Sequence, residues 1–331
     1  MSVIDIETLL GEISADAPCG EDLEYDPEFA ELESLSQATP ERQYGDTIIA
    51  AEPPDWRGVK KTALSLSQRT RDLRVAVTLA RALLHTDGLP GFLDGLSVVA
   101  GWLERYWDGV YPALDPDDDN DPTLRVNTLV ALCDQDATLR GLRETPLVSS
   151  RALGRFSLRD VQIAGGVLTP LAGTDEAELP TQAKIDGAFL DADPDELQAT
   201  AGAAAEALQL AARIEALLTD QVGVTQAPDM SDLREVLKEI RQVLAEQLHR
   251  RGVGLTDEGG GDATGDGGAS TGVAAAGQRL VVGEIGSRED AIRMLEKISE
   301  YFERYEPSSP VPFMLKRTKK LVTKDFMAIL H

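Results

Sequence analysis

The chain of 331 residues is long enough for two or three domains with hydrophobic cores of their own. Acidic residues outnumber basic ones, 57 to 32, and the net charge of −25 would repel nucleic-acid phosphates, which disfavours a DNA or RNA partner. No stretch approaches the roughly 20 apolar residues of a membrane span, and the first residues lack signal-peptide regions. Cys19 and Cys133 are far apart and predict no disulfide framework, so we expect a soluble, cytoplasmic protein.

The first strong helical signal lies in the N-terminal third of the chain. Apolar residues in the segment 73–84 follow an i, i+3, i+4, i+7 spacing, which predicts an amphipathic helix. Gly88 and Pro90 interrupt this pattern, and a second apolar stripe runs through the segment 92–107. We therefore expect two antiparallel helices joined by a short connection.

The middle of the chain is also predicted to be helical. The segment 195–222 is rich in alanine and favours a helix. The segment 231–251 places its apolar residues on one helical face, with Ser231 as the expected N-cap. Before these segments, "FSLRDVQIAGGVLT" (156–169) carries β-branched residues and glycines, which favour a short strand or hairpin.

The composition changes abruptly after Arg251. Ten glycines fall between residues 252 and 277, among small and polar side chains. Such a segment cannot offset the entropy of ordering by burying apolar surface, so we expect a flexible linker. The lysine and hydroxyl residue that end a P-loop are absent, so the glycines do not predict a phosphate-binding loop.

Helical patterns resume near the C-terminus. Ser287 and Asp290 approximate a capping box for one amphipathic helix, and three prolines within the segment 307–312 enforce an extended turn. A final helix then combines apolar residues with a cluster of lysines and an arginine. Two helices make a small core, and domains of that size usually need a staple or self-association. We expect this end to oligomerise; the alternative is that it docks on helices of the same chain.

Motifs for catalysis or metal binding are scarce in the sequence. The three histidines are far apart, neither cysteine lies in a nucleophile motif, and no GxSxG elbow occurs. His85 is expected to cap the carbonyls at the end of the first predicted helix. We therefore expect no enzymatic activity, no catalytic or metal-binding residue and no cofactor. The enzymatic alternative is a deep pocket that gathers scattered carboxylates.

The segment 108–129, "DGVYPALDPDDDNDPTLRVNTL", contains five closely spaced aspartates and suggests a calcium loop. An EF-hand needs glycine at its sixth position and glutamate at its twelfth. Counted from the first aspartate of the cluster, these positions hold Asn120 and Val126. Counted from the second, they hold Pro122 and Thr128. The EF-hand interpretation therefore fails in both registers.

A helix start explains the same aspartates better. We expect Asp121 to cap a helix whose first residue is Pro122, with the other aspartates near the positive end of the helix dipole. Arg125, one turn into this helix, is expected to neutralise part of the acidic cluster. Fortuitous binding of a divalent cation remains the alternative.

Five segments carry a resemblance to one known family. They are "ISADAPCGEDLEYDPEF" (13–29), "RDLRVAVTLARALLHTDGLPGFLDGL" (71–96), "RYWDGVYPALDPDDDNDPTLRVNTL" (105–129), "FSLRDVQIA" (156–164) and "YFERYEPSSPVPFMLKRTKKLVTKDFMAIL" (301–330). The first four resemble the ImpA N-terminal domain, the hallmark of TssA proteins of bacterial type VI secretion systems. The fifth resembles the C-terminal end of many TssA proteins.

The resemblance implies a mainly α, non-enzymatic assembly component of this secretion machine. Such a protein is expected in the bacterial cytoplasm, associated with the inner-membrane complex, where it helps baseplate assembly and coordinated polymerisation of tube and sheath. The implied regions are an ImpA-type helical domain at 1–170, a helical middle region at 180–251, the flexible linker at 252–279 and a small helical ring-forming domain at 280–331.

The resemblance also implies the partners. We expect a ring-like homo-oligomer that contacts baseplate, sheath and tube subunits directly and membrane-complex proteins indirectly, with no small-molecule substrate. Rigid and apolar side chains of the tail are the expected ring contacts: Phe302, Tyr305, Pro310, Val311, Pro312, Phe313, Leu315 and Leu321.

The family signature around the acidic loop supplies a second set of candidates. The expected partner-binding residues there are Trp107, Tyr111, Asp117, Asp119 and Arg125. The short tail favours a baseplate role over one in capping the distal end of the sheath. A generic helical adaptor outside secretion is the remaining alternative.

Overall fold

The computed structural model describes residues 2–39, 42–44, 47–115, 117, 119–170 and 179–252, with 42–44 and 47–49 described by their backbone alone. The elements are α1 (Ile6–Leu10), α2 (Pro27–Leu35), β1 (Arg42–Tyr44), β2 (Thr47–Ile49), α3 (Trp56–Leu66), α4 (Leu73–Tyr106), α5 (Thr123–Val130), η2 (Ala131–Cys133), α6 (Thr138–Glu144), β3 (Pro146–Ser150), β4 (Gly154–Ser157), α7 (Leu158–Ala164), α8 (Gln182–Asp191), α9 (Pro194–Val222) and α10 (Ser231–Arg250).

The expected mainly α fold is confirmed for this part of the chain, which belongs to one compact unit, Met1–Glu258. The linker beyond Gly252 and the region 280–331 lie outside the described residues. So do the capping box and the eight ring candidates from Phe302 to Leu321.

The central element, α4, consists of two helical arms that turn back on each other at Gly88. The φ of 68° and ψ of −151° at this residue are non-helical and suit glycine, because a side chain at positive φ is strained. The arms are antiparallel and very close, since a Cβ built on Gly95 would lie 2.4 Å from the Cα of Ala80. At the open end, the Leu73 amide donates to the Tyr111 carbonyl oxygen over 2.8 Å. The expectation of two antiparallel helices is confirmed.

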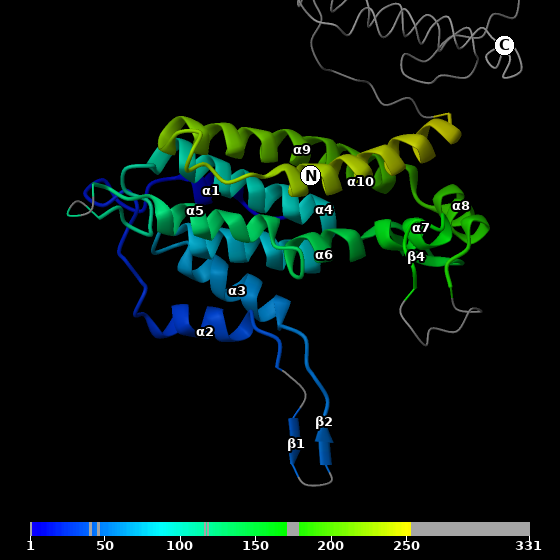
Figure 1. Cartoon of the computed structure of the whole chain (residues 1–331), viewed down its shortest axis with the longest axis horizontal. Helices are drawn as coiled ribbons and strands as arrows, with labels where there is room; N and C mark the ends of the chain where they lie inside the picture. Colours follow the sequence, from blue (N-terminus) through cyan, green and yellow to red (C-terminus); the bar gives the residue numbers. More distant parts are fainter. Residues whose placement is uncertain are drawn as a thin grey trace, which may run out of the picture. The chain divides into compact units, whose positions relative to one another are not determined.

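The other long helices stack in layers on α4 (Figure 1). On one side α3 contacts α4 and α2 contacts α3; on the other side α9 contacts α4 and α10 contacts α9. The middle region therefore belongs to the same compact unit as the N-terminal helices. The buried face of α9 is mostly alanine, which lets its backbone approach α4 closely: Ala201, Ala203, Ala204, Ala207 and Ala211.

The apolar face predicted for α10 is the face that the structure buries. Its members are Leu233, Val236, Leu237, Ile240, Leu244 and Leu248. The start of the helix differs from the prediction, because Ser231 is its first residue and Met230 occupies the cap position without a side-chain cap. The Asp229 carboxylate instead accepts the Ser231 amide hydrogen over 2.8 Å, so an aspartate two residues upstream satisfies this donor.

The β3–β4 hairpin and the helices α7 and α8 form a small lobe near the C-terminal end of α10. Strands β3 and β4 pair antiparallel, with an irregularity between Pro146 and Val148. The predicted strand in the segment 156–169 is correct only at its beginning, because β4 ends at Ser157. There Ser157 and Asp160 form a reciprocal capping box that starts α7, so local hydrogen bonding turns the following residues into helix.

The N-terminal segment is attached to the second arm of α4 by one buried carboxylate. Asp94 accepts hydrogen bonds from the Ser2 hydroxyl at 2.9 Å, the Val3 amide at 2.5 Å and the Ile4 amide at 3.1 Å. These bonds place α1 and the residues after it beside the second arm of α4.

The β1–β2 hairpin lies away from the stacked helices (Figure 1).

Candidate partner-binding surface

Arg125, on the first turn of α5, is a fully buried cation that hydrogen-bonds to backbone carbonyls. Its Nε donates to the Pro112 oxygen over 2.7 Å and its Nη2 to the Val110 oxygen over 2.6 Å, while Nη1 donates to the Trp107 oxygen. The guanidinium also lies over the Trp107 ring, 4.9 Å from its centroid. Each nitrogen of the side chain is therefore satisfied, and together the bonds fix the turn that follows α4.

This placement corrects two expectations for Arg125. The side chain is buried and directed at carbonyls, so it neither neutralises the neighbouring aspartates nor lies on the surface as a partner contact. Burial lowers the pKa of Arg125 to about 10, which still leaves the guanidinium charged near neutral pH. Its role in this surface is to position Trp107 and the backbone around it.

Arg71, just before α4, is a second buried arginine that hydrogen-bonds to backbone carbonyls. It is buried, donates to the carbonyl oxygens of Gly11, Ser67 and Thr70, and burial lowers its pKa. The Arg71 amide also donates to the Cys19 carbonyl oxygen over 2.8 Å. The loop around Cys19 is thereby attached to the start of α4.

Gly20 allows the loop around Cys19 to lie very close to the backbone of Arg69, just before α4. Its φ is 71°, and a Cβ built on it would lie 2.0 Å from the Arg69 carbonyl oxygen. The Tyr111 amide donates to the Arg71 carbonyl oxygen over 2.9 Å, and the Tyr111 hydroxyl donates to the Gly20 carbonyl oxygen over 3.3 Å. Backbone hydrogen bonds therefore join three segments that are distant in sequence into one wall.

An open hollow of about 600 Å³ lies between these segments, and we call it the Trp107 hollow. Both Trp107 and Tyr111 line it, and their part in partner binding stays a prediction. The other lining residues come from the loop 17–20, from the end of α4 and the loop after it, and from Glu12 and Gln221. They are Glu12, Ala17, Pro18, Cys19, Gly20, Glu104, Arg105, Tyr106, Asp108, Gly109 and Gln221.

The two aspartates expected to bind a partner do not line this hollow. Asp117 and Asp119 are exposed on the loop before α5. The loop is tight, because the Asp115 carboxylate accepts the Asp117 amide hydrogen over 2.9 Å and Asp119 has a φ of 52°. Their part in partner binding stays a prediction, at a place separate from the Trp107 hollow.

The helix after this loop begins one residue later than expected. α5 starts at Thr123, with Pro122 in the cap position. Asp121 nevertheless supplies the expected hydrogen bonds, because its carboxylate accepts from the Thr123 amide at 3.3 Å and hydroxyl at 2.8 Å. The helix-start interpretation is therefore correct in kind and wrong by one residue in position.

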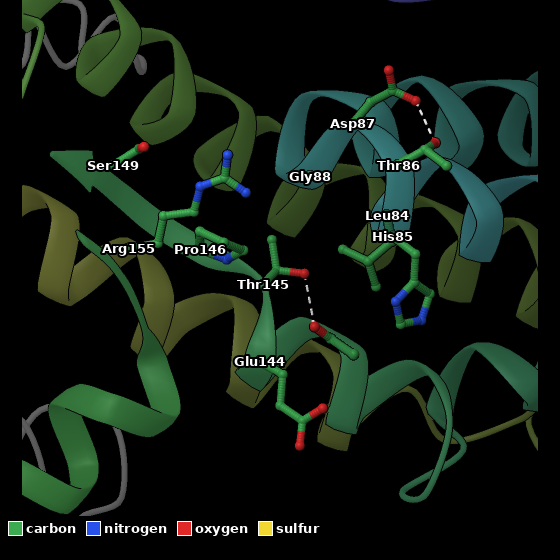
Figure 2. Close-up of a pocket in the computed structure, with 11 residues that line it drawn as sticks. Leu84, His85, Thr86, Asp87, Gly88, Glu144, Thr145, Pro146, Ser149 and Arg155 are labelled. Carbon is green, nitrogen blue, oxygen red and sulfur yellow. Dashed lines mark hydrogen bonds between the residues drawn. The ribbon is translucent and has the colours of Figure 1, made fainter. Parts of the chain in front are cut away.

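A second hollow of about 400 Å³ lies between the turn of α4, the end of α6 and the β3–β4 hairpin (Figure 2). Its two carboxylates already have partners within the protein. Asp87 pairs with Lys60 at 2.7 Å, and Glu144 pairs with Arg140 at 3.0 Å and with Arg159 at 2.8 Å. The hollow therefore offers a ligand fewer unpaired carboxylates than the Trp107 hollow does, and its lining also includes the cation of Arg155.

His85, which lines this second hollow, differs from its expected role as a helix cap. Its ring stacks on the ring of Trp56, with centroids 4.2 Å apart and an angle of 8° between the planes. Gly141 makes room for the imidazole, since a Cβ built there would lie 3.1 Å from His85 Nε2. The side chain thus joins α4 to α3 and α6 by packing.

Glu12 and Gln221, which line the Trp107 hollow, lie outside the segments that carry the family resemblance. Glu12 follows α1 and Gln221 lies near the end of α9, and the packing of α1 and α9 on α4 brings them together. Burial raises the pKa of the Cys19 thiol, and it raises that of Cys133 to about 11, which is the opposite of a nucleophilic cysteine.

The part of the chain that the structure describes contains neither a metal cluster nor a membrane span. Among residues 2–252, wherever they are described, no group of three or more histidine, cysteine, aspartate or glutamate side chains is arranged to hold a metal ion. None of the helices in the described part has both the length and the hydropathy that crossing a bilayer requires.

Comparison with known proteins first defines the class of this fold. The family model described as "ImpA, N-terminal, type VI secretion system" matches residues 10–134, which include most of the Trp107 hollow. A solved structure, the N-terminal domain including the conserved ImpA_N region of TssA from Burkholderia cenocepacia, matches with a TM-score of 0.60. It is 24% identical, and the match covers 76% of this chain and 96% of that one. The described part therefore has the fold of a TssA N-terminal domain.

A relative that matches along nearly the whole chain shows the family. The type VI secretion system component TssA1 of Pseudomonas aeruginosa is 44% identical over 332 residues, covering 99% of this chain and 94% of the relative. The chain belongs to the TssA family of type VI secretion system components. The family suggested by the sequence segments is thus confirmed.

Proposed function

We propose that this chain is a non-enzymatic scaffold that helps the type VI secretion baseplate to assemble and coordinates the polymerisation of tube and sheath. The observation that carries the proposal is the 44% identity to a TssA1 component over 99% of the chain, because it includes the C-terminal region as well as the helical body. The protein acts in the bacterial cytoplasm, next to the inner-membrane complex.

The chemistry of the helical body supports a structural role. The two buried arginines, Arg71 and Arg125, direct their donors at backbone carbonyls and so hold loops in place. The cysteine pKa values are raised by burial, which disfavours thiolate chemistry. The arginines therefore serve the fold, and neither cysteine has the lowered pKa of a nucleophile.

Self-association through the region 280–331 gives the scaffold its mechanism. A ring of C-terminal regions would carry several helical bodies on glycine-rich linkers and raise the local concentration of each body at a symmetric assembly. Weak single contacts with baseplate, sheath or tube subunits then add up to firm attachment. Contacts with membrane-complex proteins are indirect in this scheme.

Changing Leu315 and Leu321 together to glutamate should convert the assembled protein into monomers. Both are apolar residues of the tail, and burying unpaired charges in an interface opposes association. Light scattering coupled to size exclusion measures the mass directly. The control changes Lys316 and Lys320 to glutamate, which makes the same segment more negative than the leucine variant does and should leave the assembly in place if apolar contacts hold it together. Unchanged assembly in the leucine variant would contradict the proposal.

The position of the scaffold within the machine has two versions. We place it at the baseplate, whereas the alternative is the distal end of the growing sheath. Fluorescent labelling of the protein in living cells distinguishes the two while sheaths extend, because a baseplate component stays at the membrane and a sheath-end component travels with the tip. A generic adaptor outside secretion predicts no binding to baseplate, sheath or tube subunits in a pull-down.

A further inference from the structure

We propose that the Trp107 hollow binds a basic segment of a partner protein, with a lysine or arginine side chain seated among its carboxylates and aromatic rings. This inference rests on the proposed function as a scaffold and specifies the chemistry of one partner contact. The hollow is about 600 Å³, enough for a long basic side chain and part of the chain that carries it.

The charges of the hollow are the first reason. Glu12 and Asp108 line it, are exposed, and make no hydrogen bond or ion pair through their side chains with any described residue. Glu104 is paired with Arg213 at 2.5 Å, and Arg105 donates to the Leu10 carbonyl oxygen at 3.1 Å. Glu12 and Asp108 therefore have no side-chain partner among the described residues. Together with Glu104 they outnumber Arg105, the one cation of the lining, so the lining is acidic although Arg105 keeps its charge.

The aromatic residues are the second reason. Trp107, Tyr106 and Tyr111 all contribute to the lining. Arg125 already covers one face of the Trp107 ring, so a ligand cation would meet the opposite face of that ring or the rings of Tyr106 and Tyr111. Aromatic rings attract cations through their quadrupoles, and the combination of rings with unpaired carboxylates suits an ammonium or a guanidinium group. A carboxylate or phosphate ligand would instead meet the negative charge of Glu12 and Asp108.

The rigidity of the walls is the third reason. Buried Arg125 fixes the backbone of Trp107 and of the turn that follows it, and Arg71 fixes the loop around Cys19. Tyr106 donates its hydroxyl to the Leu10 carbonyl oxygen over 2.9 Å, so α1 is held in place as well. A surface that is shaped before the partner arrives loses little conformational entropy on binding.

Fluorescence anisotropy with a labelled peptide of alternating lysine and glycine tests the proposal on the full-length protein. The variant combines Glu12→Gln with Asp108→Asn, which removes both free carboxylates and keeps the size of each side chain. We expect the Kd for the peptide to rise at least about fivefold, and a peptide of alternating glutamate and glycine not to bind.

A matched control separates the hollow from the general attraction of an acidic protein. Glu235→Gln with Asp136→Asn makes the same change in net charge at two exposed residues outside the hollow, neither of which hydrogen-bonds through its side chain to a described residue. Its Kd should change less than about twofold. Equal effects of the two variants, or no binding of the lysine peptide to the unchanged protein, would overturn the proposal.

The assay distinguishes this inference from the proposed scaffold function. Peptide binding reports on the hollow alone, so it does not depend on self-association of the C-terminal region. A failed titration would leave the ring proposal intact, and monomers in the sizing experiment would leave the titration valid. An unfolded hollow variant is recognised by its circular dichroism and is replaced by the single changes Glu12→Gln and Asp108→Asn.

Discussion

Replacing Arg125 with alanine should lower the free energy of unfolding by about 3 kcal/mol or more, because three carbonyls that accept from this buried side chain lose their donor. Urea denaturation followed by circular dichroism measures this loss. The stability of Arg125→Lys should fall between those of the unchanged protein and the alanine variant, since a single ammonium group cannot reach three carbonyls with the geometry of a guanidinium.

Arg140→Ala is the control for this experiment. Arg140 is exposed and pairs with Glu144 within one helix, so its loss should cost less than about 0.5 kcal/mol. A change of similar size in the two alanine variants would contradict the assignment of Arg125 as the residue that holds the turn after α4. The Arg125→Ala protein should also bind the lysine peptide more weakly, because the turn shapes the Trp107 hollow.

Gly95→Ala should destabilise the protein by about 2 kcal/mol or more, although alanine normally favours a helix over glycine. The added methyl group would lie 2.4 Å from the Cα of Ala80 on the facing arm, so the two arms of α4 would have to separate. Gly202→Ala on α9 is the matched control, because a Cβ added there would have no other atom within 4 Å.

The control is expected to change stability in the opposite direction. Without a clash, alanine at position 202 should raise the free energy of unfolding by about 0.5 to 1 kcal/mol. Both variants are compared by urea denaturation under the same conditions. If Gly95→Ala were as stable as Gly202→Ala, the close antiparallel packing of the α4 arms would be wrong.

The helices were predictable because their signals are local. A 3.6-residue apolar spacing identifies the arms of α4 and the buried face of α10, and Gly88 marks the turn between the arms. Helix starts were predicted less accurately. Ser231 was expected as a cap and is the first helical residue, whereas Pro122 was expected as the first helical residue and occupies the cap position. In both places an aspartate side chain accepts the first free amide hydrogen. Which acceptor satisfies a helix start depends on the path of the preceding loop, and sequence alone does not define that path.

The candidate site was predictable only in part. Trp107 and Tyr111 come from one short signature segment, so closeness in sequence is enough to place them near each other. The buried role of Arg125 could not be anticipated, because an arginine next to aspartates suggests a solvated ion pair, whereas its actual acceptors are carbonyls of the preceding turn. Glu12 and Gln221 join the hollow through tertiary packing of distant helices.

Electron microscopy of the purified full-length protein tests the central claim most directly. The account predicts closed rings from which several helical bodies extend on linkers of variable path, with a single symmetry in class averages of the ring. If the images showed only separate helical bodies, at protein concentrations well above those in the cell, the proposal that this TssA-family protein is a self-associating scaffold would be contradicted.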